Sequence, residues 1–169
     1  MKAYYVENLE QRNAYLTFLS YVFEHSDVFS LLYFKYQDSE RTRKTTKEIK
    51  DALSPYKIFA KDVQEWPGTV SMDDRHIHRL VLYRADPRAK TVLERVEHLY
   101  EWSYSKYPMD LAFFKDGYAW FWSCAHEGLN ELYLSDDAMK DDMEAQDILL
   151  SECGETTVEK LFFHPKAVL

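Results

Sequence analysis

The chain has 169 residues, of which 46% are hydrophobic and 16% aromatic, so we expect one folded domain over residues 1–169 and exclude disorder over most of its length. The formal net charge is −8, and the excess lies late in the chain, since residues 127–159 hold 11 acidic side chains against Lys140 alone. An acidic surface repels nucleic acid and anionic membranes, so we expect neither as a partner; it suits a basic protein partner, and a solvated helix face is the simpler interpretation.

The N-terminal half is predicted to contain two helices and three strands. In chain order we expect a helix over 7–24, a strand over 28–36, a short helix ending near Leu53, and strands over 56–63 and 77–84. Apolar residues at helical spacing define the first helix, and aromatic and β-branched residues define the strands. Between the last two strands, Pro67-Gly68 favours a type II turn, because glycine supplies the positive φ that this turn requires.

The C-terminal half is predicted to begin with a helix and to continue with a block of three strands. In chain order we expect a helix from Pro87 to about Glu101 with Asp86 as N-cap, three strands within 110–134, a helix after the N-cap Ser135, and an edge strand over 160–164. Asp116-Gly117 favours a type I′ hairpin turn between the first two of these strands, and His126-Glu127-Gly128 forms the second turn.

This order of elements favours one fold class. Strands joined largely by hairpins, with helices between them, indicate an α+β domain with a mostly antiparallel sheet and helices packed on one face. A doubly wound parallel fold needs regular alternation of strands and helices, which this chain lacks. Residues 156–169 are expected to form a loosely packed tail or to contribute the edge strand.

The middle strand of the three-strand block carries the most distinctive side chains. Strand alternation places Trp120 and Trp122 on one face, and Trp66, which lies beside a turn, is expected to close over that face. This face is either part of the core, which is the first interpretation, or an aromatic surface that anchors a partner. The three tryptophans are therefore candidate binding residues.

His126 and Glu127 form a candidate polar site. A histidine beside a carboxylate is a common general-base arrangement, and Asp110 at the start of the block adds a second carboxylate. Adjacent strand residues point to opposite faces, so His126 and Glu127 share a site only if the strand has already bent into the turn. The simpler interpretation is that His126 is a half-buried turn residue that bonds backbone carbonyls.

His76 and His78 form a second candidate, for metal binding. Alternation puts both imidazoles on one strand face, with Asp73 and Asp74 just upstream, and two histidines with a carboxylate can bind zinc or iron(II). The sequence places no third ligand beside them. We therefore predict no metal and no cofactor, and the sequence contains none of the common nucleophile or phosphate-loop motifs.

The start of the chain and its cysteines indicate a cytoplasmic protein. Met1–Val6 meets Glu7 before an apolar run forms, and no stretch approaches the about 18 apolar residues of a membrane span. Cys124 and Cys153 have neither metal-ligand spacing nor a secreted disulfide framework around them. We expect both to be reduced thiols.

Seven short motifs between residues 13 and 127 occur together. They are Asn13-Ala14-Tyr15, Leu53-Ser54-Pro55-Tyr56, Trp66-Pro67-Gly68-Thr69, Leu99-Tyr100-Glu101-Trp102, Pro108-Met109-Asp110-Leu111, Phe113-Phe114-Lys115-Asp116-Gly117 and Ser123-Cys124-Ala125-His126-Glu127. As a set they resemble an uncharacterised family of small bacterial proteins, mainly from Gram-positive species, that is often labelled stage III sporulation protein AH. The genuine sporulation protein of that name is membrane-anchored, and we expect no anchor here, so the resemblance implies no mechanism. At the level of fold class the chain also resembles acidic α+β immunity proteins that neutralise toxins.

Three functions follow from the sequence. The first, which we favour, is a non-enzymatic cytoplasmic binding protein of immunity or antitoxin type that meets a basic protein through the aromatic strand face and the acidic last helix. The second is a small-molecule or metal-dependent enzyme that uses His126, Glu127 and Asp110, with His76 and His78. The third is a self-associating structural subunit. The sequence does not give the oligomeric state.

Overall fold

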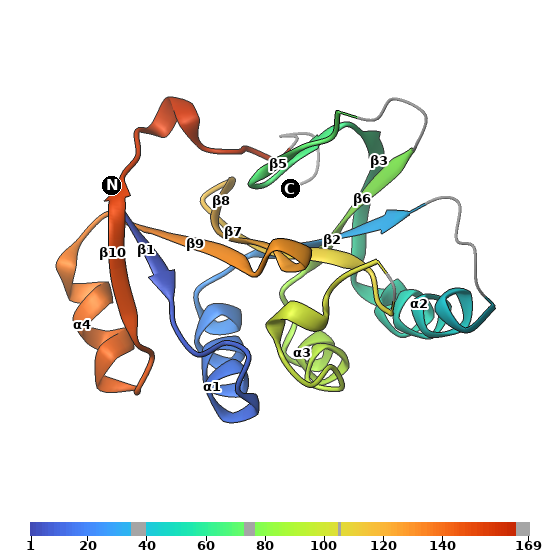
Figure 1. Cartoon of the computed structure of the whole chain (residues 1–169), viewed down its shortest axis with the longest axis horizontal. Helices are drawn as coiled ribbons and strands as arrows, with labels where there is room; N and C mark the ends of the chain where they lie inside the picture. Colours follow the sequence, from blue (N-terminus) through green and yellow to red (C-terminus); the bar gives the residue numbers. More distant parts are fainter. Residues whose placement is uncertain (35–39, 73–76, 105, 165–169) are drawn as a thin grey trace.

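An eight-stranded antiparallel sheet runs through the molecule, and the helices lie on one of its faces (Figure 1). The computed structural model describes residues 1–34, 40–72, 77–104 and 106–164. Over these residues the α-helices are α1 (Arg12–Glu24), α2 (Glu40–Leu53), α3 (Pro87–Leu93) and α4 (Asp137–Ala145). The strands of the large sheet are β1 (Lys2–Val6), β2 (Val28–Phe34), β3 (Lys57–Val63), β6 (His78–Arg84), β7 (Met109–Lys115), β8 (Tyr118–Cys124), β9 (Leu129–Leu134) and β10 (Leu150–Glu155).

The predicted α+β class with an antiparallel sheet is confirmed. The strand order is β10-β1-β9-β8-β7-β2-β6-β3, and each neighbouring pair is antiparallel. Strands β7, β8 and β9 follow one another as successive hairpins, as the sequence predicts. Asp116 and Gly117 have φ of 52° and 85°, the two positive values that a type I′ turn requires.

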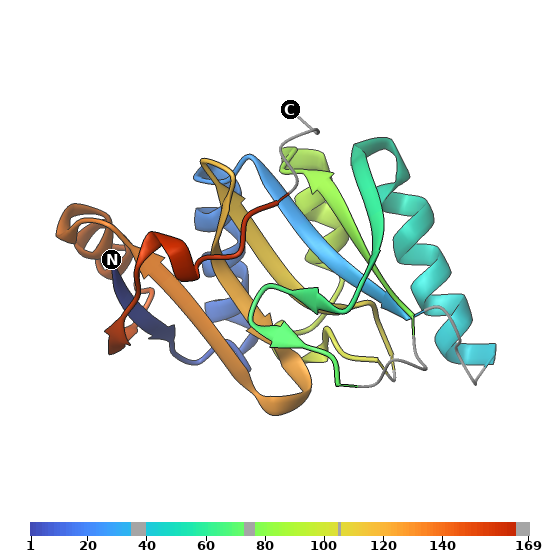
Figure 2. The ribbon, with the colours of Figure 1, turned by 90° about the horizontal axis from the view of Figure 1, so that it is seen from above.

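The middle of the sheet is buried on both faces. On β2, Phe29, Leu31 and Tyr33 belong to the apolar layer between the sheet and the helices. Val28 and Leu32 belong to a second apolar layer on the opposite face of the sheet. That opposite face, named the upper face here because it lies above the sheet in Figure 1, is covered by short segments instead of helices (Figure 2). They are the hairpin of β4 (Glu65–Trp66) and β5 (Thr69–Val70), and the chain after β10.

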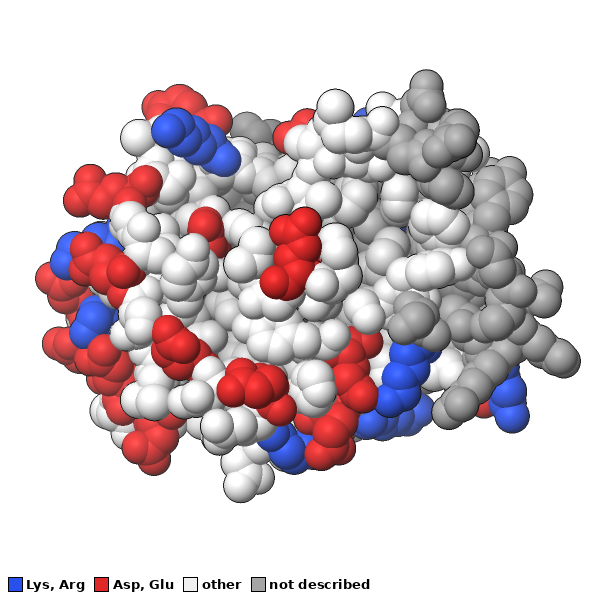
Figure 3. All heavy atoms as spheres, in the orientation of Figure 1, with Lys and Arg blue, Asp and Glu red and all other residues white. Residues whose placement is uncertain are grey.

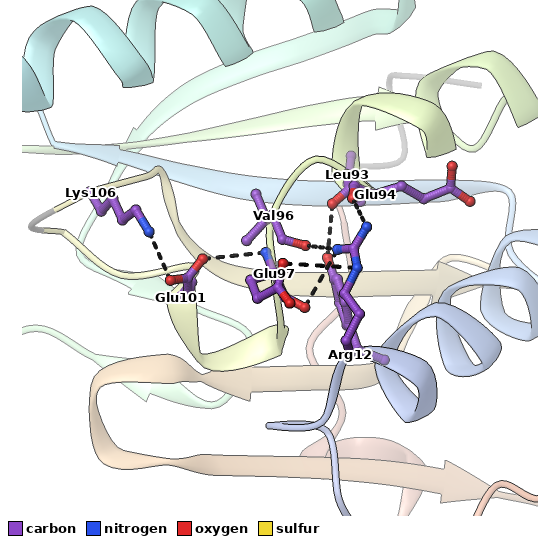
Figure 4. Close-up of polar contacts among 8 residues, drawn as sticks. Arg12, Leu93, Glu94, Val96, Glu97, Glu101 and Lys106 are labelled. Atoms are coloured by element: carbon purple, nitrogen blue, oxygen red, sulfur yellow. Dashed lines mark hydrogen bonds and ion pairs between the residues drawn. The ribbon is translucent and has the colours of Figure 1, made fainter.

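Helix α3 is shorter than the sequence predicts. It ends at Leu93, and the guanidinium of Arg12 donates to the backbone oxygens of Glu94 and Val96 just beyond it, at 2.7 Å each (Figure 4). A continuing helix would bond these carbonyls internally, so Arg12 replaces the helical partners. Val96 is still fully buried. The apolar stripe therefore correctly predicted that Val96 is buried. The prediction that α3 continues to about Glu101 is wrong.

Helix capping follows the predicted chemistry. Asp86 caps α3, because its carboxylate accepts a hydrogen bond from the backbone N–H of Arg88. Helix α4 is capped by Asp136, one residue after the predicted Ser135, and its carboxylate accepts from the N–H of Met139 at 3.0 Å. Among the described helices there is none with the length and apolar character that crossing a membrane would need.

Two strands at one edge of the sheet, β1 and β10, were not predicted. Strand β1 lies between β9 and β10, so that Tyr4 pairs with Leu132 on one side and with Glu152 on the other. Strand β10 is polar, largely exposed and contains Gly154, so its composition carries no strand signal. Its conformation comes from backbone pairing with β1.

The chain after β10 returns over the upper face to β8. This part of the chain begins with a 3-10 helix at Val158–Lys160. It then reaches β8, where the N–H of Ala119 donates to the carbonyl of Phe162 at 2.8 Å. The ring of Phe162 packs edge-on against Phe114. This segment forms a single β-bridge at Phe163 in place of the predicted edge strand over 160–164.

Candidate functional site

A β-bulge separates the two tryptophans of β8. The consecutive residues Phe113–Phe114 of β7 pair with Phe121 and Ala119, so the pairing skips Trp120. The extra residue shifts the alternation of side chains between the two faces of the sheet. Trp120 therefore lies in the layer between the sheet and the helices, and Trp122 lies on the upper face. The prediction that Trp120 and Trp122 share one face is therefore wrong. Trp120 is a core residue and takes no part in a surface site.

Trp122 is half-buried and is held in place by a chain of hydrogen bonds. Its Nε1 donates to the hydroxyl of Tyr133 at 2.8 Å, and Tyr133 donates to a carboxylate oxygen of Glu131 at 2.7 Å. Burial, followed by the hydrogen bond to Glu131, raises the pKa of Tyr133 above its usual value. One face of the indole meets the backbone of Gly68, which has a φ of 76°. The hairpin therefore rests directly on Trp122.

The hairpin is fixed a second time through Trp66, which is buried. Its Nε1 donates to Oδ2 of Asp110 at 2.9 Å, and Oδ1 of Asp110 accepts from the N–H of Ala125 at 3.0 Å. Asp110 sits in an irregular stretch of β7 with a φ of 53°, a conformation that aspartate tolerates better than most residues. Burial raises the pKa of Asp110, and the two hydrogen bonds oppose that rise.

A groove of about 530 Å³ lies over Trp122, and we name it the Trp122 groove. The hairpin forms one wall and residues 159–163 form the other, with Trp122 and Ala119 between them. At the rim, Val70 and Phe163 expose 60% and 44% of their surface. The hairpin that carries Trp66 thus covers Trp122 and leaves it accessible from one side, whereas the two-tryptophan face that Trp66 was expected to close over does not form.

Acidic side chains prevail around the Trp122 groove. Glu65 lies on the hairpin wall and Glu159 and Lys160 on the other, and Glu131 hydrogen-bonds the Tyr133 that lines the floor. A larger acidic group lies at the end of the molecule formed by α4 and β10, on the left of Figure 3. Because α4 packs on the helix face of the sheet, the acidic helix and the aromatic groove lie on opposite sides. The single interface expected from the sequence is therefore two separate surfaces.

His126 and Glu127 lie in a 3-10 helix, Ala125–Glu127, which follows β8 directly. The bend brings their side chains together, with His126 Nε2 at 3.7 Å from Glu127 Oε1. The other ring nitrogen, Nδ1, lies 3.5 Å from Sγ of Cys124. His126 and Glu127 thus share a site, because the strand has already bent into the turn at these residues.

Cys124 is the residue of this site that sequence reasoning missed. It is buried at the end of β8, close to Asp110 and His126. Burial raises the pKa of its thiol, and the neighbouring carboxylate of Asp110 raises it further. A raised thiol pKa disfavours a role as a nucleophile. The spacing Cys124-x-His126 was the available signal, but it is too common to be specific.

The histidine pair considered as a candidate metal site is only half described. His78 is buried on the upper face, where its ring lies 4.9 Å from that of Trp66. His76, with Asp73 and Asp74, lies outside the described residues. The described residues therefore do not test whether His76 and His78 bind a metal ion.

Comparison with known proteins gives no information on the function of this chain. No family model, no curated protein and no solved structure matches the chain. The resemblance to the sporulation-labelled family and to immunity proteins thus stays a prediction from sequence. Function has to be argued from the Trp122 groove and from the cluster beside it.

Proposed function

We propose that this protein is a non-enzymatic cytoplasmic binding module that holds a basic segment of a protein partner in the Trp122 groove. The observation that carries the proposal is the groove itself, about 530 Å³ in volume, with Trp122 in its floor and acidic residues on both walls. A concave site with an aromatic floor and a few polar groups is typical of binding sites, and tryptophan is enriched among residues that dominate interface affinity.

The side chains at the rim favour one partner chemistry. Glu65 and Glu159 attract a cationic side chain, and the exposed parts of Val70 and Phe163 offer apolar contact next to them. Arginine meets both requirements, because its guanidinium pairs with carboxylates and also stacks on an indole face. We therefore expect the bound segment to carry arginine or lysine beside an apolar residue.

The acidic end at α4 and β10 would act at a distance. Lying on the other side of the sheet, it would not contact a segment bound in the groove, but its field raises the encounter rate with a basic partner. An immunity protein that covers a basic toxin is one protein class with this mode of action. The burial of Cys124 at the end of β8 shields its thiol from solvent, which supports a binding role over nucleophilic catalysis.

The proposal is tested by capturing partners from a native lysate on immobilised protein. We compare the wild-type chain with Trp122→Ala, which removes the floor, and with Glu65→Gln/Glu159→Gln, which removes charge from both walls. The matched control is Glu24→Gln/Asp141→Asn, because it removes the same charge from exposed positions on α1 and α4. Elution in rising salt measures the electrostatic share.

We expect a basic protein that the wild-type chain and the control retain and that both groove variants lose. The wall variant should release it at lower salt than the wild-type chain. Retention by all four proteins, or loss in the control alone, would contradict binding in the groove and would point to the acidic end instead.

A further inference from the structure

Asp110, Cys124 and His126 form a compact cluster of metal-ligating side chains beside the Trp122 groove. One ligand atom from each lies within 4.8 Å of the others. Asp110 and Cys124 are 5% and 4% exposed, whereas the His126 side chain is 62% exposed. Two ligand atoms are thus fixed in a wall of the protein, and the third stands at the surface, where solvent and ions reach it.

The distance between the sulfur and the imidazole fits a tetrahedral metal ion. Zinc bonds thiolate sulfur at about 2.3 Å and imidazole nitrogen at about 2.0–2.1 Å, so the tetrahedral angle separates these two ligands by about 3.6 Å. The observed separation of Cys124 Sγ and His126 Nδ1 is 3.5 Å. The ligand atom of Asp110 lies within 4.8 Å of both, so zinc binding requires the exposed His126 ring and Asp110 to move closer together.

Two of the three ligands, Asp110 and His126, have polar neighbours outside the cluster. Trp66 and Ala125 donate one hydrogen bond to each oxygen of Asp110, and every carboxylate oxygen keeps a further lone pair for a metal ion. His126 Nε2 lies 3.7 Å from Oε1 of Glu127, and Nδ1 lies on the side of Cys124, 3.5 Å from its Sγ. A carboxylate behind a histidine ligand is the usual support in zinc sites, where it fixes the tautomer.

We propose that Asp110, Cys124 and His126 bind one Zn²⁺ ion, with a fourth position open to solvent. A set of one sulfur, one nitrogen and one oxygen ligand suits zinc, whereas calcium and magnesium require oxygen ligands in greater number. On binding, the Cys124 thiol gives its proton to solvent and the thiolate bonds the ion. Two anionic ligands then balance the charge of the ion. This proposal is independent of the one for the Trp122 groove.

The test uses the full chain, stripped of metal with a chelator and desalted. Titration with Zn²⁺ against a chromophoric competing chelator gives stoichiometry and affinity, and titration with Co²⁺ gives the near-ultraviolet charge-transfer band of a cobalt–thiolate bond. We expect one equivalent of each ion. Affinity should fall at least about tenfold in Cys124→Ser and His126→Ala, and about tenfold in Glu127→Gln.

The second cysteine provides the matched control. Cys153→Ser alters a thiol that lies on β10, away from the cluster, and should leave the affinity and the cobalt band unchanged. Because His126 is exposed, His126→Ala should keep its circular dichroism spectrum, so its loss of affinity reports ligation. No saturable binding, unchanged affinity in His126→Ala, or loss of binding in Cys153→Ser would each overturn the proposal.

Discussion

Gly68 rests on the indole of Trp122 so closely that a Cβ at Gly68 would lie 2.1 Å from Cε3 of that ring. This contact places the hairpin of β4 and β5 on the upper face and forms one wall of the Trp122 groove. Only glycine meets both demands at this position, since its φ of 76° is also a conformation that other residues rarely adopt. The groove therefore depends on the absence of one side chain.

Gly68→Ala should lift the hairpin from the sheet and destabilise the protein by about 2–4 kcal/mol, because it combines a steric clash with left-handed strain. Urea unfolding measures the change. The matched control is Gly128→Ala, which has a φ of 68° but no atom within 4 Å of the added Cβ, and should cost only about 1 kcal/mol. Equal costs for the two variants would show that the contact with Trp122 does not constrain the hairpin.

Acrylamide should quench the fluorescence of Trp122 and leave that of Trp120 largely protected. Trp122 is half-buried at the groove, whereas Trp120 is 1% exposed and donates to Ser26 Oγ at 2.9 Å. We expect Trp122→Phe to remove the quenchable fraction and Trp120→Phe to retain it. The opposite result would contradict the bulge that places the two rings on opposite faces.

Arg12→Met should lower the free energy of unfolding by about 2–3 kcal/mol. The substitution keeps an apolar stem but leaves the carbonyls of Glu94 and Val96 without their charged donor, and hydrogen bonds to charged groups contribute about 1.5–3 kcal/mol each. Arg88→Met is the comparison, because Arg88 pairs with Asp86 at the surface and should cost less than about 1 kcal/mol. A similar small cost for both variants would refute the role given to Arg12.

The protein should lose stability in alkali as the pH rises above about 10. The hydroxyls of Tyr33 and Tyr83 hydrogen-bond each other in the core at 2.7 Å, and burial raises the pKa of Tyr33 well above its usual value and that of Tyr83 to about 12. Raised pKa values mean that stability is complete below pH 10, where the unfolded chain is still protonated. It falls as the pH rises, by about 1.4 kcal/mol per pH unit for each such tyrosine.

Urea midpoints measured from pH 8 to 11, together with tyrosinate absorbance, check this dependence. Tyr33→Phe/Tyr83→Phe removes both ionisable hydroxyls, so its midpoint should depend less steeply on pH than that of the wild-type chain. Ionisation of all tyrosines at pH 11 with unchanged circular dichroism would contradict the burial of this pair.

The sequence predicted the centre of the sheet because local signals there agree with the tertiary structure. Asp116-Gly117 marks a hairpin through two positive φ values that few other residues adopt. Asp86-Pro87 marks the start of a helix because the Asp86 side chain caps it and proline suits the first helical position. The edge strand β10 lacked such a signal. Its polar residues become a strand only through pairing with β1, from a segment more than 140 residues away in the chain.

The candidate site was harder to predict than the fold. Strand alternation assigned Trp120 and Trp122 to one face, because a bulge depends on the partner strand and leaves no mark in the sequence of β8. The same limit applies to Cys124, which meets Asp110 only through the pairing of β7 with β8. Trp66 and Asp110 are among the candidate residues that the sequence indicates. The sequence does not predict the hydrogen bond between them, because no local pattern shows that their two segments lie side by side.

Photo-crosslinking in living cells tests the binding proposal most directly. A photoreactive phenylalanine analogue at Val70 stands at the rim of the Trp122 groove, and the same analogue at Leu149 stands at a comparably exposed position beside the acidic end, with 60% and 54% of the native side chains exposed. We predict an adduct with a basic protein from position 70 and none from position 149. An adduct from position 149 alone, or from neither position, would contradict the claim that the Trp122 groove binds the partner.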